Sequence, residues 1–94
     1  MKFLVIAHDA TTPGTLDRRM EVRPRHLEEL GPLVQAGRVA IGGVTLDENG
    51  AINGSMIVIE AESEDEVRDL IARDVYTQEG VWERVEIRPF RRSV

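Results

Sequence analysis

The sequence of 94 residues predicts one α+β domain with the element order βαββαβ. Three observations predict it. Four segments are rich in β-branched residues, two segments place apolar residues at helical spacing, and an Asn-Gly pair marks a hairpin between the second and third strands. A chain of this length is too short to divide into two separately stable cores. We therefore expect a single domain over residues 1–94.

The first strand and the first helix occupy the N-terminal part of the chain. The segment Lys2–Ala7 is rich in β-branched and aromatic residues and meets a polar turn that contains Pro and Gly. Apolar residues then recur at helical spacing up to Gly37, a residue suited to a left-handed cap. Because Pro24 and Pro32 lack a backbone donor, two alternatives remain open. The region is either a kinked helix from about Thr15 or a short turn followed by a helix with Pro24 in its first turn.

The rest of the chain supplies three strands and one helix. The expected elements are strands at Arg38–Leu46 and Ala51–Ala61, a helix at Glu64–Arg73 and a strand at Trp82–Phe90. Asn49 and Gly50 suit the positive φ angles of a tight hairpin, and Ser63 followed by Glu66 has the spacing of a capping box. This order fits a four-stranded antiparallel sheet with both helices on one face, the ferredoxin-like arrangement.

The strands predict a partner for the second face of the sheet. Leu4-Val5-Ile6, Val39-Ala40-Ile41 and Met56-Ile57-Val58-Ile59 are apolar at consecutive positions instead of alternating, so both faces favour burial. Two helices cover only one face. We therefore expect a homodimer packed sheet to sheet. The alternative is that a long loop covers the second face or that it stays modestly exposed.

Composition narrows the classes of function. The chain has 12 Lys and Arg residues against 17 Asp and Glu residues, and its net charge of −5 disfavours binding to nucleic acids. It has no cysteine, which removes disulfides, thiolate ligands and thiol nucleophiles. No apolar stretch approaches the length of a membrane span, so we expect a cytoplasmic protein without membrane contact. The two histidines lack metal-ligand spacing and no GxGxxG motif is present, so we expect neither a metal nor a cofactor.

The topology gathers polar residues at one end of the sheet. This end holds the end of the first strand, the start of the first helix, the hairpin and the end of the second helix. The polar residues expected there are His8, Asp9, Asn53, Gly54, Ser55, Asp74, Tyr76 and, on the first helix, His26. We expect a pocket for a small molecule among them.

His26 and Asp74 are the candidates for acid–base chemistry. His26 borders the apolar stripe of the first helix, one position before Leu27, and a half-buried imidazole needs a hydrogen-bond partner. Asp74, at the end of the second helix, is placed to accept from a ring N–H. That bond would fix the tautomer and leave the other nitrogen free to exchange a proton. The alternative is a histidine that only joins two helices, and spacing alone favours that alternative.

Other polar residues are candidate contacts for a substrate. These candidates are Arg23, Gly54, Ser55, Tyr76, His8 and Asp9. The guanidinium of Arg23 or Arg25 would neutralise developing charge, while Ser55 and Tyr76 would position the ligand. The ordinary interpretation of His8-Asp9 is a strand end whose Asp begins a turn. We expect the arginines of the first helix to be mostly solvated and paired with nearby glutamates.

Several different short motifs follow one another along nearly the whole chain. They are Arg23-Pro24-Arg25-His26-Leu27, Ala36-Gly37-Arg38, Gly42-Gly43, Gly54-Ser55, Asp74-Val75-Tyr76, Gly80 and Ile87-Arg88-Pro89-Phe90. In this succession the sequence resembles the YciI-like (YCII-related) family. The resemblance implies a ferredoxin-like fold that forms dimeric α/β barrels, with a His–Asp pair suspected of being an active site at His26 and Asp74. Val75 stands where the family usually has proline, a departure in the loop that carries the carboxylate.

The resemblance favours a catalytic role of the His–Asp pair over a structural one. We expect a small cofactor-independent enzyme of lyase or isomerase type that moves a proton on a small aromatic or anionic substrate. The alternative is a non-catalytic homodimer that binds a small molecule or assists a neighbouring enzyme. A cofactor-free monooxygenase acting on a phenolic substrate is a third, less favoured interpretation.

Overall fold

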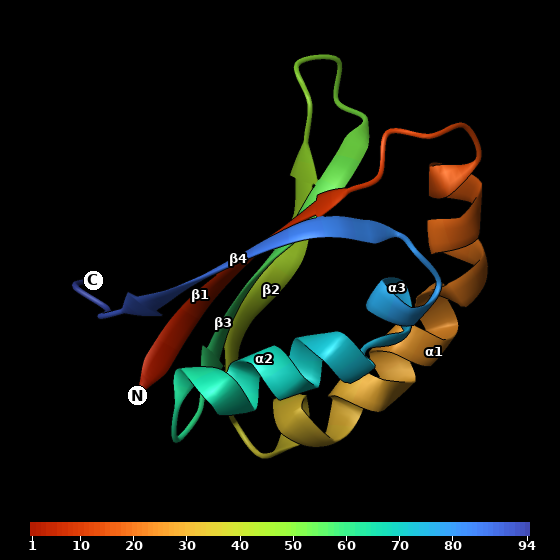
Figure 1. Ribbon diagram of the computed structural model, residues 1–94. Coiled ribbons are helices and arrows are strands. Elements are labelled where there is room, and N and C mark those ends of the chain that lie inside the picture. The colour runs from red at the N-terminus through yellow and green to blue at the C-terminus, as the bar shows by residue number, and fades with distance from the viewer.

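The computed structural model describes the whole chain, Met1–Val94, and consists of a four-stranded antiparallel sheet with helices on one face (Figure 1). The elements are, in order, β1 (Lys2–Asp9), α1 (Thr15–Gln35), β2 (Val39–Leu46), β3 (Ile52–Glu60), α2 (Glu64–Arg73), α3 (Val75–Gln78) and β4 (Trp82–Phe90). The strand order is β2-β3-β1-β4. This is the ferredoxin-like βαββαβ arrangement that the sequence predicts. None of the helices combines the length and the apolarity needed to cross a bilayer.

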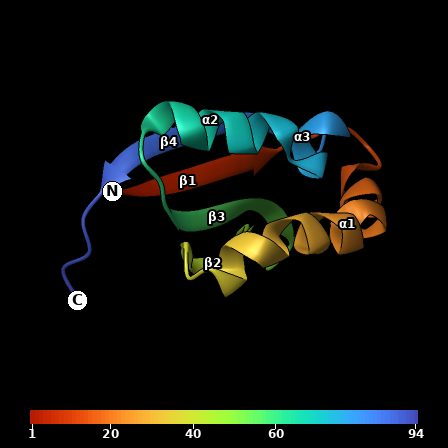
Figure 2. The ribbon, with the colours of Figure 1, turned by 90° about the horizontal axis from the view of Figure 1, so that it is seen from below.

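The first helix is continuous through both of its prolines. It begins at Thr15, after Gly14 in a left-handed conformation (φ 86°), and contains Pro24 and Pro32. Of the two alternatives left open by the sequence, the kinked helix is therefore correct. Each proline removes a backbone donor and crowds the preceding turn, which bends a helix. Figures 1 and 2 show α1 changing direction along its length, and the segment after the bend lies beside β2 and β3.

The ends of the helices follow the predicted caps with one difference. Gly37, just after α1, is left-handed (φ 74°). At the start of α2, the Ser63 hydroxyl accepts a hydrogen bond from the Glu66 N–H at 3.2 Å. The Glu66 carboxylate pairs with Arg38, which precedes β2, instead of returning to the Ser63 backbone. Only half of the capping box therefore forms, and the Glu66 carboxylate instead ties the start of α2 to the segment that leads into β2.

The β2–β3 hairpin turns at the predicted residues 47–50, but its Asn-Gly pair does not take the predicted positive φ at both positions. Gly50 takes a positive φ of 82°, but Asn49 does not. The carboxylate of Asp47 instead accepts from the backbone N–H groups of Asn49 at 2.8 Å and of Ala51 at 3.0 Å. Because an Asp side chain can organise a turn in this way, Asn49 needs no left-handed backbone.

The hydrophobic core lies between the helices and one face of the sheet. Alternate residues of β1, namely Phe3, Val5 and Ala7, are each no more than 2% exposed. They pack in the same cluster as Val67 of α2 and Tyr76 of α3. Side chains alternate along a strand, so this face buries one set of residues of β1 and leaves the other set on the opposite face.

The opposite face of the sheet has no helix over it. Leu4, Ile6 and Met56 on this face are only partly buried, and Ile41 is 58% exposed. The apolar second face that led to the prediction of a sheet-to-sheet homodimer is therefore a real feature of the fold. The homodimer itself stays a prediction.

Candidate active site

His26 and Asp74 form a buried hydrogen-bonded pair. His26 lies in the middle of α1, and Asp74 lies at the junction of α2 and α3. Nδ1 of His26 is 2.9 Å from Oδ1 of Asp74, and the two side chains are 9% and 7% exposed. An ionised carboxylate can only accept, so Nδ1 is the nitrogen that carries the shared hydrogen. The structure thus brings together the two residues that the sequence proposed as a pair.

Two aromatic rings hold the imidazole in place. The Tyr76 ring stacks on it, with centroids 4.0 Å apart and an interplanar angle of 14°. Trp82 approaches edge-on, with centroids 5.7 Å apart. Nε2 of His26 makes no hydrogen bond to the protein. Every fully buried side-chain polar atom in the structure does have a hydrogen-bond partner, so Nε2 is not fully buried. Nε2 is therefore open to the cavity that His26 lines.

A one-turn helix fixes the position of Asp74. Its Oδ1 also accepts from the backbone N–H of Tyr76 at 2.9 Å, so Asp74 is the N-cap of α3. The sequence predicted only that the chain leaves α2 here, and α3 was not expected. Val75 occupies the first helical position, where a backbone N–H has no intrahelical partner in any case. The absence of a proline at Val75 therefore leaves the turn intact.

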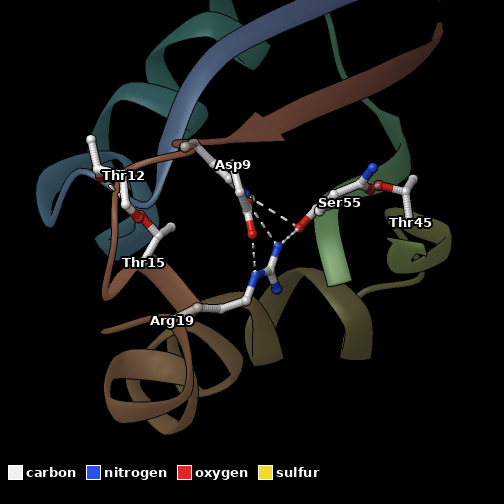
Figure 3. A network of polar contacts seen from close by, with 8 residues as sticks. Asp9, Thr12, Thr15, Arg19, Thr45 and Ser55 are labelled. Atoms are coloured by element: carbon white, nitrogen blue, oxygen red, sulfur yellow. Dashed lines mark hydrogen bonds and ion pairs between the residues drawn. The ribbon is translucent and has the colours of Figure 1, made fainter. Parts of the chain in front are cut away.

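Arg19 is a buried cation that the sequence did not single out. Figure 3 shows its guanidinium reaching from α1 towards Asp9 and Ser55. Nε and Nη2 donate to the two carboxylate oxygens of Asp9 at 2.9 and 3.2 Å, and Nη2 also donates to the Ser55 hydroxyl at 2.5 Å. The same guanidinium lies over the Tyr76 ring, 4.6 Å from its centroid. The expectation of a solvated arginine is wrong for Arg19, because Asp9 supplies a counter-charge inside the fold.

Ser55 is the point where the polar contacts converge. Its oxygen accepts from Arg19 and also from the indole N–H of Trp82 at 3.2 Å. With both acceptor positions used, the Ser55 O–H is left to donate. Ser55 lines the same cavity as His26, so this donor is available to a ligand there. Trp82, which the sequence did not propose as a site residue, thus helps to orient the hydroxyl.

A cavity of about 420 Å³, here called the His26 cavity, lies between α1 and the strands β2 and β3. Eight of its 14 lining residues are hydrophobic. The polar or charged side chains in the lining are Arg19, Arg23, His26, Ser55 and Tyr76. A mostly apolar cavity of this size with a few convergent polar groups suits a small organic molecule.

Two arginines line the His26 cavity, and only one of them is paired with a carboxylate. The charge of Arg19 is balanced by Asp9 at 2.9 Å, whereas Arg23 makes no ion pair in the structure. Burial raises the pKa of Tyr76 above its ordinary value, and the positive charges of Arg19 and Arg23 partly oppose that rise. The phenol is therefore neutral near pH 7, and Arg23 is the positive charge that remains available to a ligand.

The strand that carries His8 and Asp9 turns these two residues in opposite directions. Asp9 faces the helices, but Arg19 occupies both of its carboxylate oxygens. His8 lies on the other face of the sheet, where its Nε2 is 3.0 Å from the carboxylate of Glu86. The structure therefore does not bring His8 to the site, and Asp9 holds Arg19 instead of facing a ligand.

Gly54 is explained by the packing of the strands. A Cβ atom at Gly54 would overlap the backbone carbonyl of Ala7 on β1 and crowd the hydroxyl of Thr45. Glycine is thus required here by close approach of two backbones, one of the two reasons that a glycine in a strand suggests. Asn53 is also accounted for locally, since its side-chain oxygen accepts from Thr45 at 2.7 Å in the exposed hairpin.

The side chains of the structure form no group of three or more His, Asp or Glu residues that could hold a metal ion. The model of the YCII-related domain family matches residues 1–91. The chain belongs to this family. The matched range covers every helix and strand and contains the positions of His26 and Asp74.

Relatives of this YCII-related domain include biosynthetic proteins of fungi and a bacterial enzyme of known structure. Fusaric acid biosynthesis protein 2 of Gibberella moniliformis is 39% identical, over 96% of this chain and 92% of that protein. Aspartate kinase FUB3 of Fusarium oxysporum f. sp. lycopersici is also 39% identical, but the matched segment is only 18% of its length. The structure of 5-chloro-2-hydroxyhydroquinone dehydrochlorinase (TftG) from Burkholderia phenoliruptrix AC1100, in complex with 2,5-dihydroxybenzoquinone, is similar with a TM-score of 0.85 and 30% identity, covering 99% of this chain and 96% of TftG.

Proposed function

We propose that this YCII-related domain is a cofactor-independent enzyme of lyase or isomerase type that acts on a small phenolic or quinone-like ring. The observation that carries the proposal is the different environment of the two ring nitrogens of His26. Asp74 holds its Nδ1 at 2.9 Å, whereas its Nε2 is open to the His26 cavity. An imidazole with one nitrogen fixed and the other facing a small-molecule cavity is placed to accept and return a proton.

The arrangement suits an elimination or a proton shift. Nε2 of His26 accepts a proton from a C–H or O–H bond of the substrate, and the electron pair left behind moves into the ring. In an elimination, that pair expels a leaving group, which departs with its own bonding electrons, and the imidazolium then releases its proton to water. In an isomerisation, the imidazolium returns the proton to a different atom of the substrate. Neither step consumes an oxidant or a reductant.

The remaining polar groups of the His26 cavity would bind the oxygen atoms of the ring. The Ser55 hydroxyl and the neutral Tyr76 phenol are donors, and both line the cavity. Arg23 supplies positive charge where negative charge develops on the substrate. Arg19 fixes this set, because it contacts Ser55 and Tyr76 together and is itself held by Asp9.

The similarity to TftG supports a substrate of this kind. Dehydrochlorination is an elimination of hydrogen chloride, and the name of TftG gives a chlorinated hydroxyhydroquinone as its substrate. Its structure holds a quinone that carries two hydroxyl groups. A ring with several oxygen atoms also matches the donors around the His26 cavity of this chain.

The two histidines of the chain provide a test with a built-in control. Elimination is assayed by the release of halide from a panel of halogenated hydroxyhydroquinones. His26→Gln should lower turnover by about 10²–10⁴-fold, the usual contribution of a general acid–base group. His8→Gln should leave turnover unchanged in protein that keeps the wild-type mass by light scattering, because His8 does not line the His26 cavity. Turnover retained by His26→Gln, with the fold verified by circular dichroism, would overturn the proposal.

We also propose that the active form is a homodimer packed through the open face of the sheet. Leu4, Ile6 and Met56 lie on that face, and it has no covering element within the chain. Light scattering should give twice the mass of one chain. Ile6→Glu should give a monomer, because two unpaired carboxylates would be buried at the interface. A wild-type chain that is monomeric at high concentration would refute this part.

A non-catalytic role is the second candidate, and one observation favours it. The matching segment of Aspartate kinase FUB3 is a small part of a longer protein, which is the arrangement expected of an accessory domain. An accessory domain would bind a ring compound without converting it. Thermal-shift assays with His26→Ala and Asp74→Ala separate the two roles, since a binding module should keep its affinity for a ligand in these variants and show no conversion in the parent.

A further inference from the structure

A second cavity, here called the interhelical cavity, lies over the same face of the sheet between α1 and α2. Its volume is about 430 Å³, close to that of the His26 cavity. Eight of its 12 lining residues are hydrophobic. Its floor and walls include Val5, Ile57, Ile59, Leu33, Leu70 and Ile71. Figure 2 shows that α1 and α2 lie apart over the sheet, so the strands form the floor between them.

The two cavities are neighbours that meet at the His–Asp pair. Leu30 and Ile57 line both of them. His26 lines the His26 cavity and Asp74 lines the interhelical cavity, and these two side chains are hydrogen-bonded to each other. Leu30 on α1 and Ile57 on β3 therefore lie where the space that faces the imidazole meets the space between the helices.

The interhelical cavity is suited to an apolar occupant. The cavity opens to solvent, and apolar walls left in contact with water are unfavourable, so an apolar cavity of this size between two helices needs a reason. Water would find few partners on walls made of Leu, Ile and Val. Three charged residues line the cavity. Glu29 and Arg73 are exposed and so belong to its mouth, whereas Asp74 is buried and its carboxylate is hydrogen-bonded to His26.

We infer that the interhelical cavity receives an apolar substituent, on the scale of a short alkyl chain, of the same ligand whose ring occupies the His26 cavity. This inference rests on the proposed function and narrows its substrate class to rings that carry an alkyl side chain. An apolar cavity of about 150 Å³ can hold benzene. A cavity of about 430 Å³ therefore has room for several carbon atoms beyond Leu30.

The test uses 2,5-dihydroxybenzoquinone and its 3-alkyl derivatives from methyl to hexyl, with dissociation constants measured by calorimetry. Affinity should rise by up to about fourfold for each methylene buried, until the chain fills the cavity. Leu33→Trp fills the interhelical cavity, because Leu33 lines that cavity and not the other. It should abolish the gain from the chain and leave binding of the unsubstituted quinone unchanged. Gln35→Trp, an exposed residue of α1 that lines neither cavity, is the matched control and should keep the gain.

A measurement on the unaltered protein keeps the test independent of variant folding. In methyl NMR spectra, the butyl derivative should shift the signals of Leu33, Leu70 and Ile71, whereas the unsubstituted quinone should not. If the unsubstituted quinone binds and longer chains bring no gain, the inference fails while the proposed function survives. If neither compound binds, both fail. If Leu33→Trp instead converts a larger assembly into a smaller one, the cavity is occupied by a second copy of the chain and the inference is wrong.

Discussion

Replacement of Arg19 by methionine tests how much the buried ion pair between Arg19 and Asp9 contributes to the stability of the domain. Arg19→Met keeps much of the apolar stem but leaves the carboxylate of Asp9, which is 7% exposed, without its partner. Removing one member of a buried pair costs about 3–5 kcal/mol. Small domains are stable by about 5–15 kcal/mol in all. In a domain of this size each kcal/mol lowers Tm by about 4–8 °C, so Tm should fall by more than about 12 °C.

Urea unfolding measures this loss directly, with the fluorescence of Trp82, the only tryptophan, as the signal. The control is Arg68→Met, which breaks an exposed pair with Glu64 on α2 and should cost less than about 0.5 kcal/mol. The double variant Arg19→Met with Asp9→Leu removes both buried charges and should recover part of the stability lost in the single variant. Equal unfolding midpoints for Arg19→Met and Arg68→Met would refute the assignment of Arg19 to a buried pair.

Three further outcomes follow from the structure. Gly54→Ala should cost about 1–3 kcal/mol in thermal unfolding, because the new Cβ overlaps the Ala7 carbonyl. The hydrogen bond from His8 lowers the pKa of Glu86, so NMR titration should place that pKa below its usual value, and His8→Ala should raise it. Burial raises the pKa of Tyr76, the only tyrosine, so absorbance of the phenolate should appear above the usual range near pH 10. The raised value means that this contribution to stability is complete below the unfolded pKa and is lost as pH rises through the folded one.

The sequence predicts the elements whose signals are local. The periodicity and cap signals of α2 and the alternation of β4 reproduce Glu64–Arg73 and Trp82–Phe90 as the structure has them. The hairpin is different, because the side chain of Asp47 decides its geometry and that bond exists only after the chain has turned. The single turn α3 has no periodicity to detect. It forms because Asp74 caps it and because the core takes up Val75, which is a tertiary effect.

The sequence predicts the contact between His26 and Asp74 better than it predicts the residues that surround them. His26 and Asp74 follow from a histidine at the edge of an apolar stripe and a carboxylate on the antiparallel helix. Arg19 could not be distinguished from the neighbouring arginines, because the sequence does not show which of them is buried on folding. One signal was present: Arg19 precedes His26 by seven residues, two helical turns, and so lies on the same face of α1. The alternation of side chains along β1 likewise predicts that His8 and Asp9 lie on opposite faces of the sheet.

The charges around the His26 cavity suit the proposed proton transfer, because each new charge would form near a partner of opposite sign. Arg19 is paired with Asp9, Asp74 is paired with His26, and Arg23 lines the same cavity as His26 without an ion pair of its own. In the proposed reaction, a substrate that gives its proton to Nε2 would leave an imidazolium beside Asp74 and an anion in the cavity that Arg23 lines. In a site of low dielectric such fixed partners are worth more than in water, because they need no reorganisation when the charge appears. Arg19, whose charge is already balanced by Asp9, contacts both Ser55 and Tyr76 and would hold these two side chains in place for the proposed substrate.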